Sequence, residues 1–110
     1  MGKDGLGKFE LLVLLACLRL GADQAYAVAI VDDIRERTGR EIHRAAVYVT
    51  LQRLEEKGLI TTRLGESLPE RGGKARRLVT VEASGRVAVR DSRAALQNMW
   101  LGLGRQLEDQ

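Results

Sequence analysis

The sequence predicts a mostly α-helical fold that contains one small β-hairpin. Apolar residues recur at helical spacing in the first half of the chain and again near its end. Between these segments, the runs LITTRL and RRLVTV are rich in β-forming residues and flank a polar stretch with the only proline and a Gly-Gly pair. The expected order is therefore helix, helix, helix, hairpin, helix. A chain of 110 residues can bury a modest core as a single domain.

The first expected helix begins at Lys8 and has apolar residues on most of its faces. One stripe at i, i+3, i+4 and i+7 consists of Leu11, Leu14, Leu15 and Leu18. A helix with apolar residues on several faces is buried on more than one side, so we expect its second side to contact another subunit. The glycine-rich residues 1–7 before it are expected to be disordered.

The second and third helices are separated by a short turn. The second begins within AYAVAIVDDIRERTG and ends before Gly39. Its expected core residues are Ala27, Ile30, Val31 and Ile34. The third begins near His43 or Arg44 and ends before Gly58, with Val47, Leu51 and Leu54 facing the core. Its outer face then consists of Arg44, Ala45, Tyr48, Val49, Gln52 and Arg53.

The last expected helix extends from Glu82 to Asp109. Apolar residues follow one another at three-, four- and seven-residue spacings: Val89, Leu96, Trp100, Leu103 and Leu107. Gly102 and Gly104 weaken the last turns by roughly 1 kcal/mol each relative to alanine. The long apolar stripe predicts packing against a partner helix. We therefore expect residues 1–84 to form one region and residues 85–110 to form a dimerisation helix, within a single domain overall.

Two helices joined by a short turn and followed by a basic hairpin are typical of a winged helix-turn-helix, in which the hairpin is the wing. Small side chains on the outer face of the third helix allow close approach to the major groove, and Arg and Gln suit guanine and adenine edges. The expected DNA contacts of this helix are Arg44, Tyr48, Thr50 and Arg53, with Thr50 donating to a phosphate. Alternatively, Tyr48 packs against the wing.

The wing has a local excess of positive charge, although the net charge of the chain is only +3. From Arg63 to Arg77 there are five cations against Glu66 and Glu70. This excess suits a phosphate backbone or a minor groove, although a solvated hairpin is the alternative. The expected DNA contacts of the wing are Arg71, Lys74 and Arg76.

Composition argues against several other classes of protein. The single cysteine, Cys17, and the single histidine, His43, are far apart and do not match a zinc-site spacing. No glycine-rich stretch matches a phosphate-binding loop. We therefore expect no enzyme, no metal and no cofactor. The apolar run from Leu11 to Leu18 is far shorter than the roughly 20 residues of a membrane span, so we expect a cytoplasmic protein that does not bind membranes.

The stretches AAVYVTLQRLEEKGLI and ERGGKARRLVTVEASG closely resemble the PadR family of bacterial transcriptional regulators. The matching positions lie in the third helix and the turn after it: Tyr48, Thr50, Leu51, Arg53, Leu54, Glu55, Gly58 and Leu59. The resemblance covers roughly Phe9 to Gly85, and the last helix fits the short-tailed branch of the family. Leu78 and Val79 stand where members usually have two aromatics.

The resemblance implies a homodimer in which the last helix packs against the partner, and a repressor that binds double-stranded DNA. By two-fold symmetry, the operator is expected to be an inverted repeat. Trp100, with Leu96 and Leu103, lies on the expected dimer stripe. Two facing indoles can sandwich a small flat apolar effector, as the resemblance implies for some short-tailed members. Alternatively, Trp100 simply fills the dimer core.

The alternative function for the whole chain is a winged-helix module that binds proteins without specific DNA recognition, because the fold alone does not fix the function. Such a module would present an apolar outer face on the third helix and wing. The cations on both elements favour DNA instead.

Overall fold

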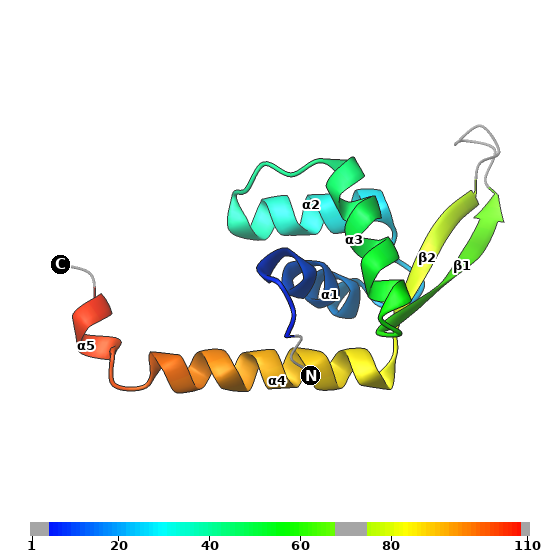
Figure 1. Cartoon of the computed structure of the whole chain (residues 1–110). Helices are drawn as coiled ribbons and strands as arrows, with labels where there is room; N and C mark the ends of the chain where they lie inside the picture. The colour runs from blue at the N-terminus through cyan, green and yellow to red at the C-terminus, as the bar shows by residue number, and fades with distance from the viewer. Residues whose placement is uncertain (1–4, 68–74, 109–110) are drawn as a thin grey trace.

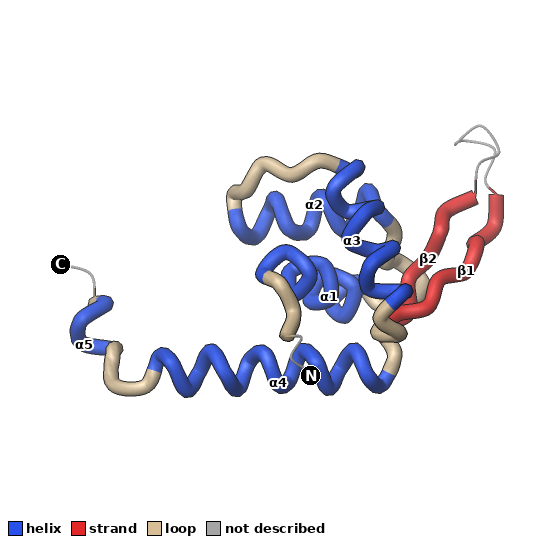
Figure 2. Tube along the Cα trace, viewed as in Figure 1, coloured by secondary structure: helices blue, strands red, loops and turns tan. Residues whose placement is uncertain are grey.

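A computed structural model of the chain describes residues 5–67 and 75–108 (Figure 1). Three helices pack together, a two-stranded hairpin projects beside them, and a long helix passes along one side (Figures 1 and 2). The elements are α1 (Lys8–Leu20), α2 (Ala27–Thr38), α3 (Arg44–Glu56), β1 (Ile60–Ser67), β2 (Ala75–Val81), α4 (Ala83–Trp100) and α5 (Gly104–Leu107). The expected order is confirmed, with one additional short helix after α4.

The core lies between α1, α2, α3 and the base of the hairpin. Its largest fully buried side chains come from each of these elements and include Leu14, Ile30, Leu54 and Ile60. All the residues expected to face inward from α2 and α3 are buried: Ala27, Ile30, Val31, Ile34, Val47, Leu51 and Leu54. The helical period therefore identifies the inner faces of these two helices correctly.

The buried face of α1 differs from the expected one. Its buried residues are Val13, Leu14, Ala16 and Cys17. The other members of the expected stripe are only half-buried: Leu11, Leu15 and Leu18. The physical reason is that α1 contacts α2, α3, α4 and β2. Because residues on several of its faces pack against these elements, the spacing of its apolar residues does not show which face is buried most deeply.

Of the segment expected to be disordered, residues 5–7 are described, whereas residues 1–4 lie outside the described residues. Leu6 packs against the core. The Gly7 N–H donates a hydrogen bond to Glu10 Oε1 at 2.9 Å, which caps the start of α1. These contacts connect Leu6 and Gly7 to the rest of the protein, and the expected disorder of the segment stays a prediction.

The turns after α2 and α3 end both helices at the expected glycines. Gly39 adopts a left-handed conformation with φ of 73°, and Gly58 has φ of 78°. The Gly58 and Leu59 N–H groups donate to the carbonyl oxygens of Glu55 and Leu54, at 2.9 and 3.0 Å. This hydrogen-bond pair closes the end of α3 and directs the chain straight into β1.

The hairpin is antiparallel, with Ile60 opposite Val81 and Leu64 opposite Arg77. The register then shifts between Leu64 and Ser67. At the base of the hairpin, the Val79 N–H donates to the Ala25 carbonyl oxygen at 2.9 Å. The connection between α1 and α2 is therefore joined to the wing by a backbone hydrogen bond.

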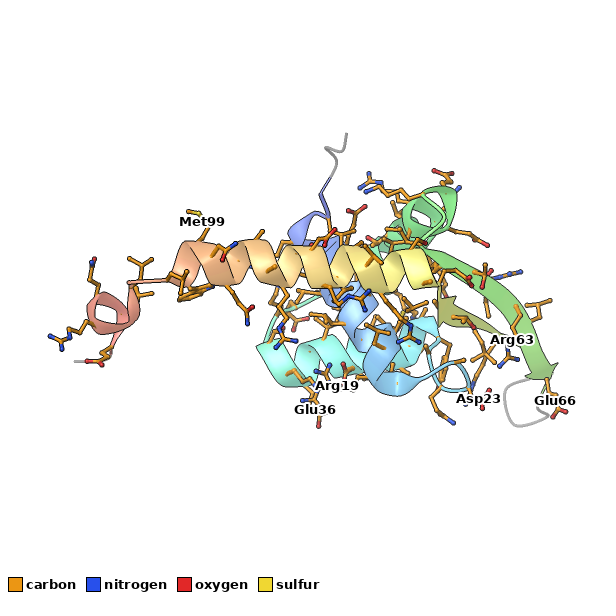
Figure 3. The ribbon with its side chains drawn as sticks, turned by 90° about the horizontal axis from the view of Figure 1, so that it is seen from below. Arg19, Asp23, Glu36, Arg63, Glu66 and Met99 are labelled. Carbon is orange, nitrogen blue, oxygen red and sulfur yellow. The ribbon has the colours of Figure 1, made fainter. Side chains whose placement is uncertain are left out.

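The last helix is shorter than expected. We expected a helix through residue 109 and a dimerisation helix over residues 85–110, but α4 begins at Ala83 and ends at Trp100. Gly102 then adopts φ of 82°, which turns the chain before the short α5. The distal half of α4 and α5 extend past the three-helix core (Figures 1 and 3).

The start of α4 is fixed against the end of α3. The Glu82 N–H donates to the Leu59 carbonyl oxygen at 2.9 Å, and Ser84 Oγ donates to the Gly58 carbonyl oxygen at 2.7 Å. Gly85 lies so close to this turn that a Cβ atom on it would be 2.4 Å from Leu59 O and 2.8 Å from Val81 Cγ1. Only glycine fits at this position without a shift of backbone.

Replacing Gly85 with alanine should destabilise the protein by about 1–3 kcal/mol, because the added methyl group overlaps the Leu59 backbone. Urea unfolding of both proteins at equal concentration measures the difference. Gly104→Ala is the matched control, since a Cβ atom there meets nothing within 4 Å. Equal unfolding midpoints for Gly85→Ala and the parent would contradict the close packing at this junction.

Candidate nucleic-acid interface

The outer face of α3 is open to solvent. In the described part of the chain no element covers it, and every residue predicted for this face is exposed: Arg44, Ala45, Tyr48, Val49, Gln52 and Arg53. Tyr48 and Val49 are 54% and 50% exposed. Arg44 begins the helix and Arg53 lies in its last turns. The face thus combines two cations, an amide and a phenol with small side chains between them.

Thr50 does not belong to this face. It is only 5% exposed and is buried with Val47, Leu51 and Leu54 on the inner side of α3. A hydroxyl in this position does not reach a phosphate on the outer side, so we remove Thr50 from the expected contacts. The signal was present in the sequence, because Thr50 lies three residues after Val47 and therefore on the same helical stripe.

An ion pair connects the end of α3 to the start of α1. Lys57 Nζ lies 3.0 Å from both carboxylate oxygens of Glu10. Partial burial acts to raise the pKa of Glu10, but the hydrogen bonds from Gly7 and Lys57 and the nearby charges of Lys57 and Arg53 hold it below its ordinary value. Lys57 is thus engaged within the protein and contributes less to the open face than Arg53.

The wing cations have different surroundings. Arg71 and Lys74 lie outside the described residues, so their expected DNA contacts stay predictions. Arg63 Nη2 donates to Asp23 Oδ1 at 2.9 Å and to the Ala22 carbonyl oxygen at 3.3 Å. Figure 3 shows Arg63 and Asp23 side by side at the base of the hairpin, with Glu66 near its far end.

The two consecutive arginines of β2 differ from each other. Arg77 is exposed, and its Nη1 donates to Thr62 Oγ1 at 3.0 Å. The guanidinium of Arg76 instead lies over the ring of Tyr26, with 4.1 Å between Cζ and the ring centroid. Arg76 was predicted as a DNA contact, whereas Arg77 was not selected although its side chain is the more exposed. As neighbours in a strand, the two side chains point to opposite faces of the hairpin.

A hollow of about 430 Å³ separates α3 from the wing. Its walls include Tyr48 and Gln52 from α3, Arg76 and Arg77 from β2, and Tyr26 at the start of α2. Tyr48 borders this hollow but stays more than half exposed, so it is not buried against the wing. The outer face of α3 and the wing therefore both border this hollow.

A second, larger concavity of about 1230 Å³ lies between α1 and α4. It is mainly apolar, and its lining includes Leu6, Leu11, Leu12, Leu59, Leu96 and Trp100. Trp100 is 59% exposed, and Leu96 is also exposed. Further exposed apolar residues continue from α4 to α5: Met99, Leu101, Leu103 and Leu107. Of the predicted interface residues, Leu96 and Trp100 line this groove, whereas Leu103, like Met99 and Leu101, is exposed beyond its lining.

Metal-ion sites and membrane-spanning helices are both absent from the described residues. No group of three or more His, Cys, Asp or Glu side chains there is arranged to hold a metal ion. No described helix combines the length and the hydropathy needed to cross a membrane. Burial raises the pKa of the Cys17 thiol to about 12.

Comparison with known proteins gives a family and a fold. The family model "Transcriptional regulator PadR-like family" matches residues 14–91. A PadR family transcriptional regulator from Eggerthella lenta DSM 2243 is 26% identical, with a TM-score of 0.68, over 90% of this chain and 83% of that chain. A PadR family regulator from Clostridium difficile R20291 is 18% identical, with a TM-score of 0.73, over 93% of this chain and 100% of that one. Curated protein sequences show no significant match.

Replacing Glu10 with glutamine should reduce stability in a pH-dependent way. A carboxylate whose pKa is lowered by folding adds stability above its unfolded pKa and loses it as pH falls through the folded pKa. We expect Glu10→Gln to lower the free energy of unfolding by about 1 kcal/mol near pH 7. The difference should shrink below the ordinary pKa of 4.5.

Urea titrations at about pH 7, 5 and 3.5 check this dependence. Glu36→Gln, at an exposed glutamate of α2 labelled in Figure 3, is the control and should change little. A stability loss for Glu10→Gln that is the same at every pH would show that the charge of Glu10 does not contribute to the free energy of unfolding.

Proposed function

Because the chain belongs to the PadR-like family of transcriptional regulators, we propose that it recognises a specific operator in double-stranded DNA through the outer face of α3 and the wing. The observation that supports this most strongly is the open face of α3, where Arg44, Gln52 and Arg53 are exposed beside small side chains. Because the family is one of transcriptional regulators, DNA binding rather than catalysis is the proposed activity.

In this proposal α3 lies in the major groove. Ala45 and Val49 are small enough to let the helix approach the groove floor, while Gln52 and Arg53 form hydrogen bonds with base edges. Arg44 is the first residue of α3, and no side chain caps this helix start. The free N–H groups there favour a phosphate, so we assign Arg44 to the DNA backbone.

The wing is proposed to touch the neighbouring backbone. Arg77 is exposed on the described part of the hairpin, and Arg71 and Lys74 add positive charge in the part outside the described residues. These residues neutralise phosphates and give affinity without reading sequence. The alternative of a protein-interaction module needs an apolar outer face on α3, and the cations and amide found there favour DNA.

We also propose that the protein is a homodimer formed through α4. The exposed apolar residues of α4 and α5 and the groove along α1 make a surface that a second copy can cover. The proposed division into a DNA-binding region of residues 1–84 and a dimerisation region of residues 85–110 falls within the first turn of α4. A two-fold dimer presents two α3 helices to an inverted repeat, about one helical turn or a multiple of it apart.

We propose repression as the outcome, because a dimer bound at a promoter excludes other proteins from the same DNA. The groove beside Leu96 and Trp100 is the proposed site for a small flat apolar effector, with Leu103 at its C-terminal side. Such a compound would change the spacing of the two α3 helices by altering how the copies pack.

Arg53→Ala should weaken binding to the operator by roughly tenfold or more and reduce the preference for operator over shuffled DNA, because a base contact is lost. Fluorescence anisotropy with both DNA fragments measures this preference. Arg35→Ala, at an exposed residue of α2, is the matched control. Equal weakening on both fragments would mean that Arg53 contacts a phosphate and reads no base.

Lys74→Ala should weaken binding to both fragments about equally and reduce the slope of log affinity against log salt by roughly one, because one phosphate contact is lost. The same anisotropy titrations at several salt concentrations give this slope. An unchanged slope would exclude Lys74 from the phosphate contacts of the wing.

Leu96→Glu should convert the dimer to a monomer, because it places a charge on the apolar surface of α4. Light scattering during size-exclusion chromatography measures the mass. Asn98→Glu is the control, since two residues along a helix correspond to about 200° of rotation around its axis. A Leu96→Glu protein that stays dimeric would place the dimer interface elsewhere.

A further inference from the structure

The base of the wing is attached to the connection between α1 and α2. The Val79 N–H of β2 donates to the Ala25 carbonyl oxygen at 2.9 Å. On the other strand, Arg63 donates to Asp23 and to the Ala22 carbonyl oxygen, as the labelled pair in Figure 3 shows. Both strands therefore contact the connection between α1 and α2, and the described part of the hairpin projects beyond it (Figure 1).

Beyond this base, Arg76 makes the next contact towards the wing tip. Its guanidinium covers the ring of Tyr26, the residue that immediately precedes α2, with 4.1 Å from Cζ to the ring centroid. The Arg76 Nε atom is shielded from solvent and has no hydrogen-bond partner among the described residues. One face of this guanidinium thus lies on the Tyr26 ring, and its Nε edge is turned away from solvent.

Arg77, the residue after Arg76, connects β2 to α3 through Thr62. Arg77 donates to Thr62 Oγ1 at 3.0 Å, and Thr62 Oγ1 donates to Glu55 Oε2 at 3.3 Å. Since Glu55 belongs to α3 and Tyr26 adjoins α2, residues 76 and 77 connect the wing to both helices of the helix-turn-helix. The hollow of about 430 Å³ lies between these connections. The width of this hollow depends on the position of β2 relative to α3.

We propose that Arg76 is a positioning residue, which by stacking on Tyr26 holds the wing at the angle where the wing and α3 contact DNA together. This inference rests on the proposed function and replaces the direct DNA contact expected for Arg76. A planar guanidinium stacks on an aromatic ring in a way that an ammonium does not, so arginine is required rather than any cation. Tyr26 acts through its ring, and its hydroxyl has no part in the arrangement.

The test compares Arg76→Lys, Tyr26→Leu, the double variant and Tyr26→Phe. Anisotropy with the operator fragment is measured at two salt concentrations and well below the unfolding temperature of every variant. We expect Arg76→Lys and Tyr26→Leu each to weaken binding by roughly fivefold or more, and the double variant to be no weaker than the weaker single one. Tyr26→Phe should bind like the parent, and the salt slope should be unchanged throughout.

A direct phosphate contact gives a different pattern. Arg76→Lys would then keep most of the affinity, because it keeps the charge that meets the phosphate, and Tyr26→Leu would bind like the parent. That pattern would overturn the proposal. Weakening by Tyr26→Leu that Tyr26→Phe shares would also overturn it, since the ring would then not be the relevant group.

A second measurement needs no DNA. Spin labels on Glu66→Cys in the wing and Ala45→Cys on α3 report the distance between these elements, in labelled chains diluted with unlabelled ones. The native Cys17 is buried and its thiol pKa is about 12, so it does not compete for the label. We expect a narrow distance distribution for the parent and for Tyr26→Phe, and a broad one for Arg76→Lys and Tyr26→Leu.

The two measurements separate the two claims. If the parent protein binds no operator but the distance distribution still broadens in Arg76→Lys, the proposed function fails and the positioning role of the stack stands. If operator binding is specific and the distribution is equally narrow in all variants, the proposed function stands and the positioning role is refuted.

Discussion

The packing of α3 against α1 and α2 is the contact on which the rest of the structure depends. Val47, Leu51 and Leu54 are buried in the core, and each side chain of this kind contributes about 1.5–3 kcal/mol when fully buried. Because a helix is rigid, burying this stripe fixes the direction in which Tyr48, Gln52 and Arg53 point. The exposed face needs no further support from loops, which makes it suited to recognition.

The turn after α3 extends this constraint to the wing and to α4. Gly58 and Leu59 accept hydrogen bonds from Ser84 and Glu82, and Gly85 leaves no space for a side chain beside Leu59. The end of α3, the start of β1 and the start of α4 therefore meet at one junction. In a dimer formed through α4, this junction sets how far apart the two α3 helices lie, and so it links the apolar groove to the spacing of the operator halves.

Much of this arrangement could be predicted from the sequence, because local patterns determine it. The inner faces of α2 and α3 follow from the helical period, and the ends of both helices follow from Gly39 and Gly58. The buried face of α1 could not be chosen, since apolar residues surround that helix. α4 ends at Trp100 because Leu101 leaves the helical conformation and Gly102 then adopts a positive φ, and the apolar spacing beyond Trp100 gave no sign of this turn.

The candidate site was predicted less completely, because it depends on contacts between distant residues. Thr50 was assigned by its chemistry although its spacing placed it inside. Arg76 and Arg77 look equivalent as sequence, yet one stacks on Tyr26, which is fifty positions earlier in the chain, and the other stays exposed. No periodic pattern reports such a tertiary contact, so only the structure separates the arginine that stacks on Tyr26 from the more exposed one that hydrogen-bonds to Thr62.

The most direct test of the central claim is an anisotropy titration of the unmodified protein. The DNA from upstream of its own gene is compared with a shuffled fragment of equal length and composition, at two salt concentrations. Sequence recognition by α3 predicts tighter binding to the native fragment, and phosphate contacts predict a steep loss of affinity with salt on both. Equal and weak binding to the two fragments, by a protein that is folded and dimeric, would contradict the proposal that the open face of α3 recognises an operator there.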